Sequence, residues 1–250
     1  MRLNSSNSVM TLSKKIKAII WDFDGTLVDT SLKNFNVAKQ IIADLTGEEA
    51  ESFPIFQSLE TYNLANRSYK NWREMYKAEY GFSEEETDRA GSLWTEYQLQ
   101  NDTPIEFFPG LGRVIKSLKQ FPQGIVSMNS QSNIKQTLTD NKLSDLFQFV
   151  VGYEEVDMQK QKPEPDGLLM CLKKLTGLAS GYVFYIGDHE TDVKCAANAN
   201  NLLRKKGVNL WVLTIGAFYG SDHDDSGWKT KPDYKANQTQ DIVEIIQPYT

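Results

Sequence analysis

The stretch Trp21-Asp22-Phe23-Asp24-Gly25-Thr26-Leu27-Val28-Asp29-Thr30 is the part of this chain that decides its fold. It continues an apolar run that begins at Lys17 and reads as a buried strand. Two carboxylates, Asp22 and Asp24, follow at the end of this strand, and Gly25 then allows a tight turn. Open α/β proteins bind ligands at such strand ends. Taken alone, however, the stretch is better explained as an ordinary turn, because Asp and Gly both favour turns.

The paired carboxylates suit two kinds of chemistry. One carboxylate can attack an electrophile and form a covalent intermediate while the other moves a proton. Both can also supply oxygen ligands to a hard cation such as magnesium. Three later segments of the chain supply further polar residues for such a site.

These three segments follow one another in a defined order. Gln123–Ser130 begins as a short apolar strand that ends in the hydroxyl residue Ser127. Gln161–Gly167 presents Lys162 in an extended conformation, because the residue before a proline disfavours the helix. Tyr182–Asp192 is another buried strand that ends in acids.

Together with the first stretch, these segments resemble the four signature motifs of the haloacid dehalogenase superfamily of phosphohydrolases. Each motif is weak alone, but four motifs in the same order rarely coincide. Lys162-Pro163-Glu164-Pro165-Asp166 and the Gly187-Asp188-x-x-x-Asp192 spacing are most similar to the phosphoglycolate phosphatase and β-phosphoglucomutase branch. The segment between Thr30 and Pro104 carries no motif.

The resemblance implies catalytic roles for Asp22, Asp24 and Lys162, and a metal-binding role for Asp188. Asp22 would be the nucleophile that takes the phosphoryl group as an aspartyl-phosphate, and Asp24 would be the general acid and base. The Asp22 side chain, the backbone carbonyl of Asp24 and Asp188 would hold magnesium. Lys162 would neutralise charge on the phosphoryl group during transfer.

Four further residues would support this chemistry. Ser127 and Met128 would bind the substrate phosphate. Asp192 would orient Lys162 or a metal-bound water, and Thr26 would fix the general acid through its hydroxyl. Three of the motif residues also have ordinary structural explanations. Ser127 could cap the next helix, Lys162 could be a solvated lysine, and Asp192 could be a first-turn acid that favours a helix dipole.

Asp24 also separates branches of the family. The hydrolytic dehalogenases lack this second aspartate, because they have no phosphate ester to protonate, and the phosphonate-cleaving branch replaces it as well. The presence of Asp24 therefore predicts phosphate ester or anhydride chemistry.

Alternating strands and helices predict an α/β core with a parallel, Rossmann-like sheet. Strands are expected at Lys17–Asp22, Gly124–Ser127, Phe149–Gly152, Val183–Gly187 and Asn209–Ile215. Helices are expected at Leu111–Lys119, Ser132–Asn141, Pro165–Leu175 and Asp192–Asn200. The run Asn201–Gly207 reads as a lengthened link to the next strand.

Residues 31–103 break this alternation and predict an all-helical cap domain inserted after the first strand. Helices are expected at Leu32–Leu45, Ser58–Tyr80 and Ser83–Asn101, with Gly47 and Gly81 near helix ends. Residues 14–30 and 104–250 would form the catalytic core, and residues 1–13 a flexible tail. In the resembling family such a cap closes over the site and excludes water.

The cap offers three basic candidates for substrate contact, Arg67, Lys70 and Arg73, with no preference among them. They lie in a segment that interleaves basic and aromatic residues, and an ordinary amphipathic helix explains that pattern better than a binding surface. Outside the motifs, His189 could tune a metal site or serve as a peripheral hydrogen-bonding residue. The acidic loop Gly220–Gly227 could bind a cation, although its Gly and Ser content favours a mobile surface loop.

Composition narrows the possible partners and location. The chain has 250 residues, 40% of them hydrophobic, which suffices for one sizeable core with a smaller inserted domain. A net charge of −6 argues against nucleic acid or an anionic membrane as a partner. Cys171 and Cys195 form neither a C-x-x-C nor a zinc pattern, which favours reduced thiols in the cytoplasm. Both a monomer and a homodimer remain open.

The sequence thus predicts a magnesium-dependent phosphatase. It would hydrolyse a small phosphomonoester, a phosphorylated metabolite, through an aspartyl-phosphate intermediate. Two alternatives remain open: a phosphomutase of the same family, and a non-catalytic binding or regulatory protein that kept the fold.

Overall fold

A six-stranded parallel sheet forms the centre of the molecule in the computed structural model, which describes residues 15–69, 71–220 and 224–250. The predicted tail, residues 1–13, lies outside the described residues. The strands follow the order β5-β4-β1-β6-β7-β8. Their bounds are β1 (Ile16–Trp21), β4 (Gln123–Val126), β5 (Phe149–Val151), β6 (Gly181–Gly187), β7 (Leu210–Ala217) and β8 (Tyr234–Ala236). The predicted Rossmann-like α/β sheet is confirmed, with β1 between β4 and β6.

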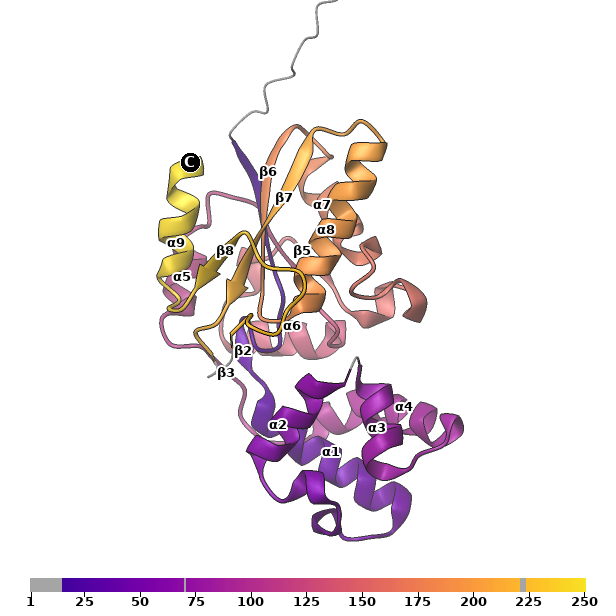
Figure 1. Cartoon of the computed structure of the whole chain (residues 1–250). Coiled ribbons are helices and arrows are strands. Elements are labelled where there is room, and N and C mark those ends of the chain that lie inside the picture. Colours follow the sequence, from indigo (N-terminus) through magenta and orange to yellow (C-terminus); the bar gives the residue numbers. More distant parts are fainter. Residues whose placement is uncertain (1–14, 70, 221–223) are drawn as a thin grey trace, which may run out of the picture.

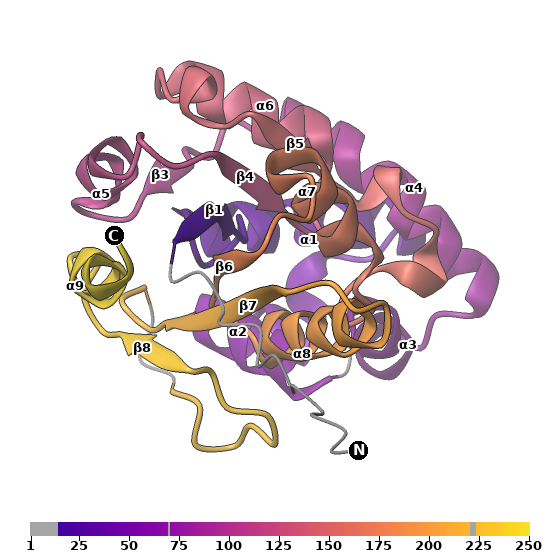
Figure 2. The same cartoon turned by 90° about the horizontal axis from the view of Figure 1, so that it is seen from above.

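Helices cover both faces of this sheet (Figure 2). One layer comprises α5 (Leu111–Ser117), α6 (Gln131–Asp140) and α9 (Asp241–Ile246), and the other comprises α7 (Asp166–Thr176) and α8 (Glu190–Lys205). Side chains alternate along β1, as a strand requires. Ile19 and Trp21 pack with the first layer, whereas Ala18 and Ile20 pack with the second.

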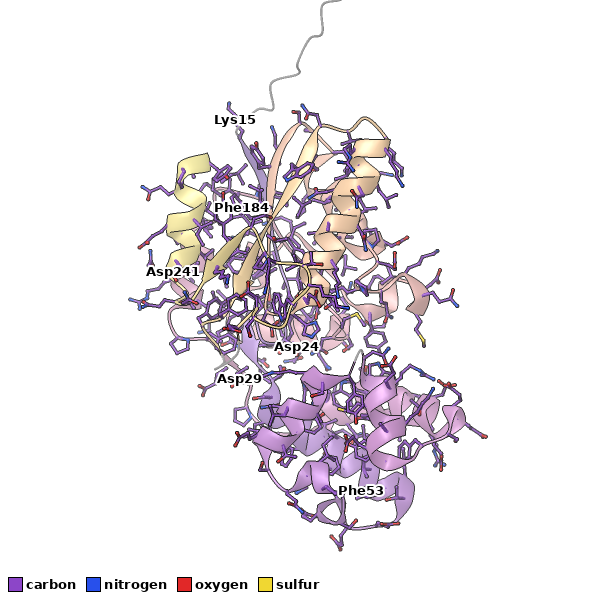
Figure 3. The ribbon with its side chains drawn as sticks, in the orientation of Figure 1. Lys15, Asp24, Asp29, Phe53, Phe184 and Asp241 are labelled. Carbon is purple, nitrogen blue, oxygen red and sulfur yellow. The ribbon has the colours of Figure 1, made fainter. Side chains whose placement is uncertain are left out.

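A helical cap is inserted between two short strands, β2 (Val28–Asp29) and β3 (Glu106–Phe107). These strands pair antiparallel, so the chain leaves the core and returns to it side by side. The cap contains α1 (Ser31–Thr46), α2 (Leu59–Ser68), α3 (Trp72–Tyr80) and α4 (Glu84–Gln100). It forms a separate lobe with its own aromatic-rich core (Figure 1). Figure 3 shows that Asp24, not Lys15, lies at the end of β1 nearest to this lobe.

Short 3-10 helices occur between the longer elements and after α9. They are η1 (Ala50–Ser52), η2 (Pro54–Phe56), η3 (Ser144–Leu146), η4 (Tyr153–Glu155), η5 (Met158–Lys160) and η6 (Gln247–Tyr249). Among the described residues, no helix is both long and apolar enough to cross a membrane.

The expected single helix Ser58–Tyr80 is wrong, because the structure contains two helices there, α2 and α3. The side chain of Asn71 accepts a hydrogen bond from the backbone N–H of Glu74 and so caps a new helix. Gly47 and Gly81 do end helices, as predicted, with positive φ angles of 72° and 69°.

The expected link at Asn201–Gly207 is also wrong, since α8 continues to Lys205. Leu203 is buried in the core, one helical repeat beyond the buried Ala199, and this apolar spacing prolongs the helix. In the 220–227 loop, residues 221–223 lie outside the description. Asp225 departs from the expected exposed loop, because it is 4% exposed and pairs with Lys235 at 2.7 Å.

A buried glutamine joins the central sheet to its first helical layer. The Trp21 indole N–H donates to Gln123 Oε1 at 3.0 Å, and Gln123 Nε2 donates to the Ile115 carbonyl at 3.0 Å. All three residues are fully buried. The amide therefore satisfies two polar groups that water does not reach.

We expect Gln123→Leu to lower the free energy of unfolding by about 2–4 kcal/mol, because it leaves two buried polar groups without partners. The measurement is urea-induced unfolding of the wild type and the variant. Gln136→Leu is the matched control, since Gln136 is exposed on α6; its effect should stay within about 0.5 kcal/mol. Equal stability of the two variants would show that the buried amide does not join the layers.

Candidate active site

Three strands deliver the candidate site to one edge of the sheet. Asp22 follows β1, Ser127 follows β4 and Asp188 follows β6. Because these neighbouring strands are parallel, their carboxyl ends meet at the same edge. The Asp22 backbone N–H donates to the Ile186 carbonyl at 2.8 Å, which fixes the nucleophile candidate beside the end of β6.

The turn after Asp22 requires glycine at position 25. Gly25 has a φ of 76°, and a Cβ atom there would overlap the carboxylate of Asp188. Thr26 follows, and its hydroxyl donates to Asp188 Oδ1 at 3.1 Å. The predicted bond from Thr26 to Asp24 is therefore wrong, because the turn directs the threonine hydroxyl toward the end of β6.

Lys162 is the buried cation of the site. Its Nζ donates to Asp22 Oδ1 and to Asp192 Oδ1, both at 2.6 Å, and its side chain is 5% exposed. Burial alone would lower the pKa of Lys162, but the facing Asp192 and Asp22 carboxylates outweigh it and raise this pKa. The explanation of Lys162 as a solvated lysine is therefore excluded. The Lys162–Pro163 peptide bond is cis.

Asp192 uses its two carboxylate oxygens for two purposes. Oδ1 accepts from Lys162 and from the Tyr185 hydroxyl, the latter at 3.0 Å. Oδ2 accepts from the His189 backbone N–H at 3.2 Å, and His189 Nδ1 accepts from the Thr191 N–H, so both side chains cap α8. Asp192 thus both contacts Lys162 and caps α8. His189 is a hydrogen-bonding residue at the N-terminal end of this helix.

Asp24 is held by an amide that the sequence did not single out. Asn129 Nδ2 donates to Asp24 Oδ1 at 3.0 Å. Asn129 Oδ1 accepts from the Ser130 N–H and from Asn133 Nδ2, and this pattern fixes the orientation of the amide. Burial raises the pKa of Asp24, while hydrogen bonds from Thr30 and Asn129 oppose that rise.

Ser127 and Met128 line the same edge. Ser127 is buried, and its Oγ accepts from the Asn129 backbone N–H at 3.0 Å. The residue that caps α6 is Ser130, so the capping explanation of Ser127 is wrong. The Met128 side chain is 42% exposed. Phosphate binding by Ser127 and Met128 stays a prediction.

Three carboxylates form a cluster that can hold a metal ion. Oxygen atoms of Asp22, Asp188 and Asp192 lie within 4.8 Å of one another. Burial, then repulsion from Asp192, raises the pKa of Asp188 to about 7. Three acids face one lysine, so the cluster has excess negative charge that a cation would balance. Oxygen donors without His or Cys fit a hard cation rather than zinc.

The three cap candidates differ in their surroundings. Arg73 pairs with Glu84 at 2.8 Å and with Asp88 at 2.7 Å, so its guanidinium is bound inside the cap. Arg67 is exposed in the last turn of α2. Lys70 lies outside the described residues. Of the two candidates that the structure describes, Arg67 therefore has no ion pair with another described residue, whereas Arg73 has two.

A family model described as haloacid dehalogenase-like hydrolase matches residues 19–202, which include all four motifs. The chain belongs to this family. The predicted superfamily, and a phosphohydrolase as the class of enzyme, are confirmed.

Relatives of this haloacid dehalogenase-like hydrolase align over nearly its whole length. The pyrophosphatase PpaX of Listeria monocytogenes is 24% identical over 245 residues, which cover 94% of this chain and 99% of the relative. The pyrophosphatase PpaX of Bacillus cereus is 24% identical and is covered to 97%, with 93% of this chain.

Solved structures share the fold. A predicted phosphoglycolate phosphatase from Haemophilus somnus superposes with a TM-score of 0.69 at 19% identity, over 93% of this chain and 98% of the other. A haloacid dehalogenase-like family hydrolase from Streptococcus pneumoniae gives 0.69 at 17% identity, over 93% and 99%. They support the α/β core with a helical cap.

We expect Lys162→Met to lower the free energy of unfolding by about 3–5 kcal/mol, because it leaves the buried Asp22 and Asp192 without their cation. The measurement is urea-induced unfolding in the absence of divalent cations. Lys160→Met is the matched control, since Lys160 is exposed and pairs only with the exposed Asp157 within the described residues. A loss no larger than that of the control would contradict the role assigned to Lys162.

Proposed function

We propose that this haloacid dehalogenase-like hydrolase is a magnesium-dependent phosphatase that hydrolyses a small phosphomonoester through an aspartyl-phosphate on Asp22. One observation carries the proposal. The Asp22 carboxylate is bound by the buried Lys162, while Asp24, two residues on, has a separate set of hydrogen-bond donors. The two acids thus have different environments, as a nucleophile and a proton-transfer group require.

In the first step, a carboxylate oxygen of Asp22 attacks phosphorus, and the bond from phosphorus to the leaving oxygen breaks. Asp24 gives its proton to that oxygen. Burial raises the pKa of both Asp22 and Asp24, and the Lys162 ammonium against Asp22 opposes the rise there. Lys162 lies against Asp22 and balances negative charge on the phosphoryl group during transfer. Ser127 would hydrogen-bond a phosphate oxygen, and the Met128 backbone N–H would add a second donor.

In the second step, Asp24 takes a proton from water, and the resulting hydroxide attacks phosphorus. The bond to Asp22 breaks, and inorganic phosphate leaves. Asp192 supports both steps indirectly, because it holds the ammonium of Lys162 in place together with Tyr185.

Asp22, Asp188 and the backbone carbonyl of Asp24 would hold magnesium, with Asp192 beside them. When bound, the ion neutralises phosphate oxygens and positions them for in-line transfer. The cap would exclude water and favour a small phosphorylated metabolite as the substrate. Both cysteines are free and buried, which is consistent with our proposal of a cytoplasmic enzyme.

A second substrate class is a phosphoanhydride. The similarity to proteins named pyrophosphatase, over almost the full length of both chains, favours testing inorganic pyrophosphate. The chemistry at Asp22 and Asp24 would be the same, with phosphate as the leaving group. A phosphomutase would use the same intermediate but return the phosphoryl group to a bound sugar.

We expect Asp22→Asn to abolish phosphate release from every substrate, because an amide cannot act as the anionic nucleophile. Asp24→Asn should lower turnover by about 10²–10⁴-fold, the usual contribution of a general acid or base. The assay is phosphate release from a panel of phosphorylated metabolites, pyrophosphate and an aryl phosphate. Asp145→Asn is the control, since Asp145 is exposed on η3. Substantial turnover by a folded Asp22→Asn variant would contradict the assignment of Asp22 as the nucleophile.

We expect activity to require magnesium, to disappear with a chelator and to return poorly with calcium. Calcium accepts more ligands and often both oxygens of one carboxylate, so it would misplace the attacking oxygen of Asp22. The measurement is turnover after dialysis against chelator and addition of each metal. Full activity of the exhaustively chelated enzyme would contradict the metal assignment.

A further inference from the structure

A polar contact joins the cap directly to the core. The hydroxyls of Thr95, on α4, and Tyr153, at the start of η4, lie 2.9 Å apart, although the two residues are 58 positions apart in the chain. Both side chains are partly buried. The contact is separate from the β2–β3 connection and therefore fixes the position of α4 against the core by a second route.

The backbone of Tyr153 is bound to two loops of the candidate active site. Its N–H donates to the Asn129 carbonyl at 3.1 Å, and its carbonyl accepts from Gln161 Nε2 at 3.1 Å. Gly152 makes this approach possible, since a Cβ atom there would lie 2.6 Å from the Gln131 nitrogen and 2.8 Å from the Asn129 carbonyl oxygen. The backbone of Tyr153 therefore fixes the loops at Asn129 and Gln161 relative to each other.

These loops carry residues next to the groups to which the proposed function assigns the chemistry. Asn129 Nδ2 donates to Asp24 Oδ1, and Gln161 precedes Lys162. Separate hydrogen bonds thus link Thr95 to the Tyr153 side chain, the Tyr153 backbone to the Asn129 backbone, and the Asn129 side chain to the carboxyl of Asp24. A displacement of Tyr153 would move the amide that orients this carboxyl.

We propose that Tyr153 is a positioning residue through which the docked cap aligns Asp24 for proton transfer. The proposal rests on the phosphatase function proposed above. Proton transfer in the transition state depends on short, aligned contacts, and small misplacements reduce it strongly. The Thr95 hydroxyl supplies the cap side of this alignment, and the Asn129 amide supplies the core side.

The test uses Tyr153→Phe, Thr95→Val and the double variant. For an alkyl phosphate, whose leaving group needs a proton, kcat/KM should fall about two- to tenfold in each single variant, the effect of one net hydrogen bond. For 4-nitrophenyl phosphate, whose nitrophenolate leaving group needs no proton, kcat/KM should change by less than about twofold. The kcat/KM of the double variant should be no lower than that of the less active single variant, because both substitutions remove the same contact.

Two controls separate alignment from general damage. Tyr97→Phe removes a tyrosine hydroxyl from the same helix, where it bonds Asp44 inside the cap, and should leave both substrates unaffected. Thr95→Ser keeps the hydroxyl and should restore the wild-type ratio between the two substrates. Equal losses on both substrates, or additive losses in the double variant, would overturn the proposal.

A second measurement does not depend on activity. Hydrogen exchange of backbone amides in α4 and in the β2–β3 connection should be faster in Tyr153→Phe and Thr95→Val than in Tyr97→Phe. If the wild type hydrolyses no phosphate but this exchange difference appears, the contact stands and the proposed function fails. If the wild type is active and neither exchange nor substrate ratio changes, the contact has no positioning role.

Discussion

The buried ammonium of Lys162 is the interaction on which the site depends. It bonds Asp22, at the end of β1, and Asp192, in the first turn of α8, at 2.6 Å each. Lys162 itself comes from the segment before α7, so one charge joins three parts of the core. Buried carboxylates of this kind are costly without a partner, and the cation makes their close approach possible.

The same charge distribution connects stability with chemistry. The carboxylates of Asp22, Asp188 and Asp192 exceed the charge of the single lysine. Burial first, and then repulsion from Asp192, raises the pKa of Asp188 to about 7. A divalent cation would offset the negative charge by which these three carboxylates exceed Lys162. The negative charge that Lys162 leaves unbalanced therefore supports the proposed metal site.

Much of the core could be predicted from the sequence, because the relevant signals are local. Asp22 and Asp24 follow an apolar strand directly, and Ser127 and Asp188 follow strands in the same way. Hydrogen bonds between residues far apart in the chain could not be predicted, because no local sequence pattern marks them. The hydroxyl of Thr26 reaches Asp188, 162 positions away, and the Asn129 amide reaches Asp24, 105 positions away. Only the packed sheet brings these pairs together.

Local structure was less predictable where elements are short or capped by single residues. The capping side chain of Asn71 divides the expected cap helix, and the two-residue strands β2 and β3 carry too few residues for a periodic pattern. The edge strand β8 and the helix α9 were not predicted either. With 3 and 6 residues, they are too short to show a clear periodic pattern. The composition of the cap likewise does not identify which of its residues would contact a substrate.

The central claim is that Asp22 carries the phosphoryl group, and the most direct test is to trap that intermediate. Asp24→Asn should accept phosphate from 4-nitrophenyl phosphate, whose leaving group needs no proton, but should release it slowly because the base is missing. Acid quenching followed by peptide mapping then locates the phosphate. The account predicts a burst of about one nitrophenol per enzyme and a phosphorylated peptide modified at Asp22. Phosphate on any other residue, or an active wild type whose variant shows no burst, would contradict it.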